Sequence, residues 1–154
     1  MPPRLLLTVG LPGSGKSTYL ELLGAHAVSS DHVRHLLADD RGDQSIHPQV
    51  FETVRHLVRQ RLSIGRPATY VDATHLTRME RQPYVQIAAE FQVEIEALWF
   101  DVPLETCLAR NALRPNPVPD DAIRKMAARL EPPSLDEGFH AVTRMWRLIE
   151  SRQA

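Results

Sequence analysis

The order of apolar and polar residues along the chain predicts strands and helices in alternation. Four short apolar runs bounded by turn residues predict β-strands at 4–9, 26–29, 68–72 and 93–100. Spacings of three and four predict a helix at 47–63, where the recurring apolar residues are Val50, Val54, Leu57, Val58 and Leu62. Further helices are predicted at 15–24, 32–37, 78–91, 104–113 and 121–130, and a polar loop at 38–45.

Helix-length segments between strands imply parallel pairing through right-handed crossovers. Residues 139–149 fit two interpretations: a helix, or a fifth parallel strand at 141–146 followed by a short tail. We favour the strand, since it completes a sheet of the βα type. The expected fold class is therefore α/β, with three layers (α/β/α) around a mostly or fully parallel five-stranded sheet.

Three local signals refine the predicted helix boundaries. Either Ser30 or Asp31 can cap the helix that follows the second strand, and Thr77 can cap the fourth predicted helix. Pro83 lies inside that fourth helix, so a kink or a late start is expected there.

Residues 10–18, with the sequence GLPGSGKST, match the Walker A pattern G-x-x-x-x-G-K-[ST] between the first strand and the first helix. The three glycines can adopt positive φ and close around an anion, and the helix N-terminus favours negative charge. Lys16 can reach the β- and γ-phosphates, and the Ser17 hydroxyl can bind Mg²⁺. The sequence therefore predicts binding of ATP or another nucleoside triphosphate with Mg²⁺, through Gly10, Pro12, Gly13, Ser14, Gly15, Lys16, Ser17 and Thr18.

Asp31 and Asp72 follow the second and third predicted strands. In an open α/β sheet the carboxyl ends of the strands form the ligand-binding rim, so both acids are expected near the Walker A loop. Asp31 is placed to accept a proton from a hydroxyl acceptor, and Arg34 to hold a phosphate of that acceptor. Asp72 can hold Mg²⁺, directly or through water, or orient Arg34. The simpler interpretations are a capping Asp31, a surface Arg34 and a polar strand end.

Arg110 and Arg114 lie four residues apart before a segment rich in proline. If the helix extends that far, they share one face. Residues 110–133 are predicted to form a helical lid that brings both arginines over the triphosphate, where they bind it and stabilise the developing charge. The alternative is a pair of solvated arginines.

Composition narrows the class of protein. The chain has 154 residues, 43% of them hydrophobic and 24% charged, which suits one soluble domain over residues 1–154. No apolar run is long enough for a membrane span, no signal peptide is recognised, and Cys107 is the only cysteine, so we expect a cytoplasmic protein without a membrane partner. A formal net charge of −1 predicts that any contact with nucleic acid is short and local. The sequence does not indicate an oligomeric state.

At this point the chain resembles a known family, the polynucleotide kinase branch of the P-loop phosphotransferases. The matching motifs, in family order, are Gly10-x-Pro12-Gly13-Ser14-Gly15-Lys16-Ser17-Thr18, Ser30-Asp31-x-x-Arg34, Val71-Asp72-Ala73-Thr74, Phe100-Asp101-Val102-Pro103, Arg110-Asn111-x-x-Arg114, Val118-Pro119 and Glu137-Gly138-Phe139. The resemblance implies a P-loop NTPase fold of the kinase type and transfer of a γ-phosphate to the 5′-hydroxyl end of RNA or DNA. It also implies that Asp31 is the general base, that Arg34 binds the 3′-phosphate of the terminal nucleotide, and that Arg110 and Arg114 are lid arginines.

Two departures leave the acceptor open. Position 75 is His where many relatives have Asn. We also expect a stand-alone kinase module, without the phosphatase or ligase domain often fused to such kinases. A kinase for a small hydroxyl-bearing molecule is therefore the first alternative. A nucleotide-dependent switch with slow hydrolysis and a protein partner is the second.

Overall fold

A computed structural model describes residues 2–145. The strands are β1 (Arg4–Val9), β2 (Val28–Ser29), β3 (Ala68–Asp72), β4 (Glu94–Trp99) and β5 (Ala141–Arg144). The helices are α1 (Lys16–Leu22), α2 (Ser30–Ala38), α3 (His47–Ser63), α4 (Arg78–Phe91), α5 (Leu104–Ala112), α6 (Asp120–Arg129) and the short 3₁₀ helix η1 (Leu135–Glu137). None of the helices in this part of the chain has the length and apolar character of a membrane span.

The five strands form one sheet in the order β2-β3-β1-β4-β5, with every neighbouring pair parallel. The α/β class and the parallel five-stranded sheet are thereby confirmed. The fifth strand is confirmed at 141–144, where it pairs with β4. The remainder of that prediction, from Trp146 onward, lies outside the described residues.

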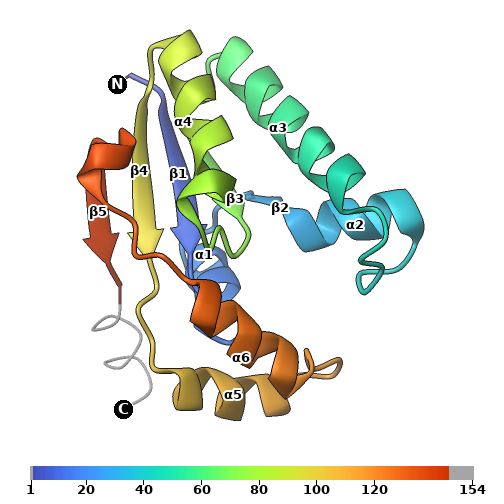
Figure 1. Ribbon diagram of the computed structural model, residues 1–154. Coiled ribbons are helices and arrows are strands. Elements are labelled where there is room, and N and C mark those ends of the chain that lie inside the picture. Colours follow the sequence, from blue (N-terminus) through green and yellow to red (C-terminus); the bar gives the residue numbers. More distant parts are fainter. Residues whose placement is uncertain (1, 146–154) are drawn as a thin grey trace.

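Because β1 is central, its apolar run from Leu5 to Leu7 is buried on both sides of the sheet. In Figure 1, α3 and α4 cover one face of the sheet, and α1 lies behind it. The main core joins these two helices to the strands, through Val50, Val54, Val58, Leu62, Tyr84 and Ile87 among others. On the other face, Tyr19 of α1 packs against a cluster that contains Leu6 and Phe100.

A separate apolar cluster lies below the carboxyl edge of the sheet, where α5 and α6 pack together (Figure 1). It contains Leu11, Leu76, Cys107, Leu108 and Ile123. Leu11 belongs to the Walker A loop, so this cluster connects both helices directly to that loop. Helix α6 lies within the predicted lid, whereas most of α5 precedes it. Whether residues 110–133 move as a lid stays a prediction.

Some predicted boundaries are wrong. Helix α2 begins at Ser30, and its cap is Ser29, whose hydroxyl accepts a hydrogen bond from the His32 amide at 3.2 Å, so neither Ser30 nor Asp31 is the cap. Thr77 is confirmed as the cap of α4. That helix begins at Arg78 and includes Pro83, so a late start is wrong. Pro83 is the sixth residue of α4, beyond the first four amides that lack a helical partner, so the helix forgoes the hydrogen bond that an amide at this position would donate to the Met79 carbonyl.

Candidate active site

The loop between β1 and α1 depends on glycine for two different reasons. Gly13 and Gly15 have φ of 83° and 96°, a left-handed conformation that favours glycine. A Cβ on Gly13 would also lie 2.4 Å from the Cys107 carbonyl oxygen of α5. The φ of Gly10 is not positive, which corrects the expectation for that residue. Its Cβ would instead lie 2.8 Å from the Ser14 Oγ, so close packing explains the glycine there.

Lys16 lies across this loop with only 8% of its surface exposed. Its Nζ donates hydrogen bonds to the carbonyl oxygens of Gly10 (2.9 Å) and Leu11 (2.8 Å). Burial lowers its pKa to about 8, and the negative charges of Asp72 and Asp31 oppose that shift. The charge of Arg114 adds to the lowering. Three residues predicted for the site, from three separate segments of the chain, therefore act electrostatically on this one ammonium group.

Ser17 and Asp72 meet directly at the rim. The Ser17 hydroxyl donates a 2.7 Å hydrogen bond to Oδ2 of Asp72, at the end of β3. A hydroxyl and a carboxylate are oxygen ligands of the kind that Mg²⁺ prefers, and Mg²⁺ usually combines one or two of them with water and substrate phosphates. The described residues contain no cluster of three or more His, Cys, Asp or Glu side chains suited to a metal. This pair therefore fits a magnesium ion that is held jointly with a nucleotide.

The loop also fits a nucleotide. The buried Ser14 hydroxyl has no hydrogen-bond partner within residues 2–145, and Lys16 contacts only loop carbonyls that a phosphate oxygen can replace. Main-chain amides at the start of α1 and a buried cation favour an anion at this position. The assignment of residues 10–18 to a triphosphate stays a prediction that this geometry supports.

Arg34 is buried, with 3% of its surface exposed, although a surface position was one interpretation of the sequence. One guanidinium nitrogen donates to the Asp43 carbonyl oxygen at 2.9 Å, and the other lies 3.3 Å from Nδ1 of His47. The pKa of His47 is lowered, first by burial and then by the Arg34 charge, so the neutral imidazole can accept this hydrogen bond. Asp72 is not among these contacts; its side chain bonds Ser17, which favours the metal role over orientation of Arg34.

Arg110 and Arg114 do not lie on one helix face, because α5 ends at Ala112. Arg114 lies in the turn that follows, and the side chain of Asn111 closes this turn. Its amide donates to the Val118 carbonyl at 2.7 Å, and its oxygen accepts from the Val118 amide at 3.0 Å. Asn111 is buried and was not predicted as a functional residue; its position between the two arginines was the available signal.

The residue at position 75 does not face an acceptor. His75 is buried, with φ of 45°, and its Nδ1 donates to the Thr8 carbonyl oxygen at 2.6 Å, directly below the Walker A loop. Burial lowers its pKa to about 4, so the ring is neutral near pH 7. The ring meets Tyr84 of α4 edge to face, with centroids 5.1 Å apart.

A buried ion pair, also missed from the sequence, supports this turn. Arg81 and Glu137 have 0% and 5% of their side chains exposed and are joined by two hydrogen bonds of 2.8 and 3.0 Å. The remaining Arg81 nitrogen donates to the His75 carbonyl at 2.8 Å. Since the pair is bidentate and further hydrogen-bonded, it is the kind of buried ion pair that offsets its own desolvation. It joins the turn after β3 to η1.

A model of the family AAA_33, described as an AAA domain, matches residues 5–133. Two curated proteins also match, both L-seryl-tRNA(Sec) kinases: the Mus musculus protein is 31% identical over 93 residues, and the Homo sapiens protein is 31% identical over 90. These matches cover 60% and 58% of this chain but 26% of each relative, so the chain spans about a quarter of the length of the curated relatives it matches.

Similar solved structures include the Pnkp1/Rnl/Hen1 RNA repair complex. It aligns with a TM-score of 0.70 and 25% identity over 83% of this chain and 44% of that chain. The Mycobacterium tuberculosis APS kinase CysC, in complex with AMPPNP and APS, aligns over 100% of both chains with a TM-score of 0.60 and 18% identity. At that identity the second likeness shows the fold alone, which is that of a P-loop kinase.

Proposed function

We propose, from the premise that the chain belongs to the AAA domain family AAA_33, that this protein is a P-loop kinase acting on a polynucleotide. It transfers the γ-phosphate of ATP, or of another nucleoside triphosphate, to the 5′-hydroxyl end of RNA or DNA. The observation that carries this proposal is the register of β2 on β3: Ser29, two residues before Asp31, pairs with Asp72, whose carboxylate bonds Ser17 of the Walker A loop. The charge of Asp31 also acts on Lys16, the residue assigned to the γ-phosphate. Asp31, the proposed base for the acceptor hydroxyl, and Lys16, the proposed ligand of the donor phosphate, thus belong to one site.

In the proposed reaction, Asp31 takes the proton from the acceptor hydroxyl. The acceptor oxygen forms a bond to the γ-phosphorus while the bond to the β–γ bridging oxygen breaks, so the nucleoside diphosphate leaves. Lys16 exchanges its two loop carbonyls for phosphate oxygens, and Arg114 adds positive charge as negative charge develops. A magnesium ion held by Ser17 and Asp72 would supply further charge neutralisation on the β- and γ-phosphates.

The acceptor is assigned to nucleic acid on two grounds. Arg34 follows Asp31 by one helical turn, so a phosphate that it binds lies close to the hydroxyl that Asp31 deprotonates. Three of the relatives described above support this assignment, since two are named L-seryl-tRNA(Sec) kinase and one belongs to an RNA repair complex.

Those names also support a second candidate. A seryl hydroxyl carried on tRNA is an acceptor of the same chemical kind, and the 31% identity to L-seryl-tRNA(Sec) kinase favours testing it. A small hydroxyl-bearing molecule is the third acceptor to test. The three share the donor site and differ only in what Arg34 and its surroundings hold.

Labelled γ-phosphate transfer from ATP distinguishes these acceptors. The panel contains 5′-hydroxyl oligoribonucleotides and oligodeoxyribonucleotides, seryl-tRNA, and a pool of small metabolites, each with and without Mg²⁺. We expect labelled oligonucleotides whose label is removed by a phosphatase specific for 5′ ends. Label found only on seryl-tRNA or on a metabolite would replace the proposed acceptor, and nucleotide turnover that no acceptor accelerates would contradict kinase activity.

A further inference from the structure

One row of side chains on α3 runs from the predicted acceptor site along the length of the helix. It consists of His47, Phe51, Arg55 and Arg59, spaced four residues apart. The row begins at Arg34, whose guanidinium lies 3.3 Å from Nδ1 of His47. The His47 and Phe51 rings are in contact, with centroids 4.9 Å apart.

The row faces α4, and its members differ in the charged residues that lie opposite them. At the rim end, the Glu80 and Arg129 charges act on His47 and shift its pKa in opposite directions. At the far end, Arg59 forms an ion pair with Glu90 through two hydrogen bonds. Both ends of the row therefore have an acidic residue opposite them.

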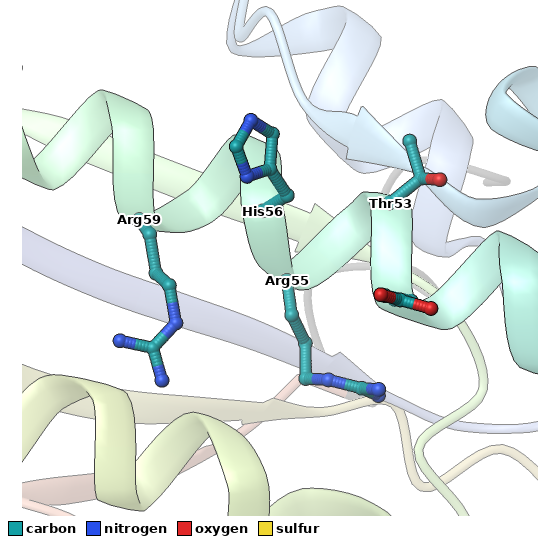
Figure 2. Close-up of a pocket in the computed structure, with 5 residues that line it drawn as sticks. Thr53, Arg55, His56 and Arg59 are labelled. Carbon is teal, nitrogen blue, oxygen red and sulfur yellow. The ribbon is translucent and has the colours of Figure 1, made fainter.

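Arg55, which lies between these two ends, has no acidic residue of α4 paired with it. Its positive charge acts on the buried Tyr84 hydroxyl, and it has no hydrogen bond or ion pair within residues 2–145. The side chain is half-buried and lines a hollow of about 400 Å³, together with Glu52, Thr53, His56 and Arg59. In Figure 2, Arg55 and Arg59 extend from the same side of α3. The hollow also contains the carboxylate of Glu52, but no hydrogen bond or ion pair joins it to Arg55 within residues 2–145. A half-buried guanidinium that is not paired with a carboxylate is suited to an anion.

We infer that this hollow binds a backbone phosphate of the acceptor strand, with Arg55 as its anchoring cation. The inference rests on the proposed function, and it identifies a second contact with the acceptor strand, several nucleotides away from the 5′ end. Eight residues of helix place Arg55 about 12 Å from His47. At about 3.4 Å per stacked nucleotide, this distance corresponds to a phosphate about three or four nucleotides from the one at Arg34.

The experiment varies acceptor length and salt. Phosphate transfer and fluorescence anisotropy are measured on the full chain, with 5′-hydroxyl oligoribonucleotides of two, four and eight nucleotides. The variants are Arg55→Gln and Arg55→Lys, and the matched control is Arg66→Gln, since Arg66 is an exposed arginine beyond the far end of the same helix. Unfolding midpoints establish that each variant is folded.

For the wild type we expect KM to fall about tenfold between the dinucleotide and the octanucleotide, as for one charged hydrogen-bonded contact. Arg55→Gln should remove most of that gain, leave kcat and the dinucleotide KM unchanged, and make the slope of log Kd against log salt shallower by about 0.7. Arg55→Lys should restore the salt slope in part. Arg66→Gln should change none of these values.

Equal length and salt dependence in Arg55→Gln and Arg66→Gln would overturn the inference while leaving the proposed function intact. Inorganic phosphate whose binding depends on Arg55 but is not displaced by the octanucleotide would show a site for a free anion and would also overturn the inference. Conversely, oligonucleotides that bind with the expected dependence on Arg55 but receive no phosphate would refute the proposed function and support the hollow as a nucleic-acid site.

Discussion

The donor side and the acceptor side of the rim are built in different ways. On the donor side, Lys16 contacts carbonyls only five and six residues away, within one continuous loop. On the acceptor side, Arg34 is held by a carbonyl nine residues away and a histidine thirteen residues away, across the segment between α2 and α3. The contacts of Lys16 on the donor side therefore lie within one short loop. The contacts of Arg34 on the acceptor side depend instead on the conformation of the segment between α2 and α3.

This difference predicts how each side receives its ligand. The backbone that surrounds a phosphate on the donor side is already fixed by Gly13, packed on α5. On the acceptor side, a phosphate must compete with Asp43 and His47 for the guanidinium of Arg34, because both of its terminal nitrogens are engaged. Acceptor binding should therefore rearrange residues 39–46 more than nucleotide binding does.

The largest effect is expected at the donor side. Lys16→Ala should lower kcat for phosphate transfer by about 10³-fold or more, because a buried cation on the transferred phosphate has no substitute. Labelled transfer from ATP measures this, and the unfolding midpoint checks the fold. A variant that retains more than a tenth of wild-type activity would show that Lys16 does not contact the reacting phosphate.

Asp31→Asn tests whether the two sides meet at one reacting centre. It should lower kcat by about 10²- to 10⁴-fold, the usual contribution of a general base, while the Kd for nucleotide changes less than about threefold. The matched control is Asp39→Asn, at the exposed C-cap of the same helix, where Asn suits the left-handed backbone equally well. Equal effects of the two substitutions on kcat would show that Asp31 is not the general base.

Arg34→Gln tests the acceptor grip alone. With an acceptor that carries a 3′-phosphate, KM should rise about 10- to 100-fold, the range for a hydrogen-bonded charge, and kcat should change little. With an acceptor that lacks this phosphate, the same substitution should change KM by less than about threefold. A uniform rise in KM for both acceptors would mean that Arg34 only shapes the loop.

The smallest effect concerns the support beneath the donor loop. The folded-state pKa of His75 is lowered from 6.5 to about 4, so below pH 6.5 the unfolded chain binds a proton that the folded chain does not. Stability should therefore fall as pH falls from about 6.5 toward 4, and between pH 7 and 5 the loss at this residue is about 2 kcal/mol.

Urea unfolding at pH 7 and pH 5 measures this loss, and His75→Asn should abolish it. Asn tolerates the positive φ at this position, so the backbone is preserved. His26→Asn, at an exposed site, is the control and should leave the pH dependence unchanged. Since the pKa of His47 is also lowered, a smaller pH dependence should persist in His75→Asn. A pH dependence as large as that of the wild type would place the main titrating group elsewhere.

The sequence by itself determined those features that depend on residues close together in the chain. Alternating apolar segments were sufficient for the parallel sheet and for α3 at 47–63, since periodicity reports which face of an element is buried. The Walker A loop and the rim position of Asp72 followed from a contiguous motif and from a strand end. These features require no knowledge of which distant elements meet.

Only the tertiary structure decided the rest. Ser29 was missed as the α2 cap because β2 is two residues long and gives a weak pattern. Burial of Arg34, the Arg81–Glu137 pair and the uncompensated charge of Arg55 depend on contacts between elements far apart in the chain. Charges and hydrogen bonds act through distance and burial, which a linear sequence does not state, and so the acceptor side required the fold.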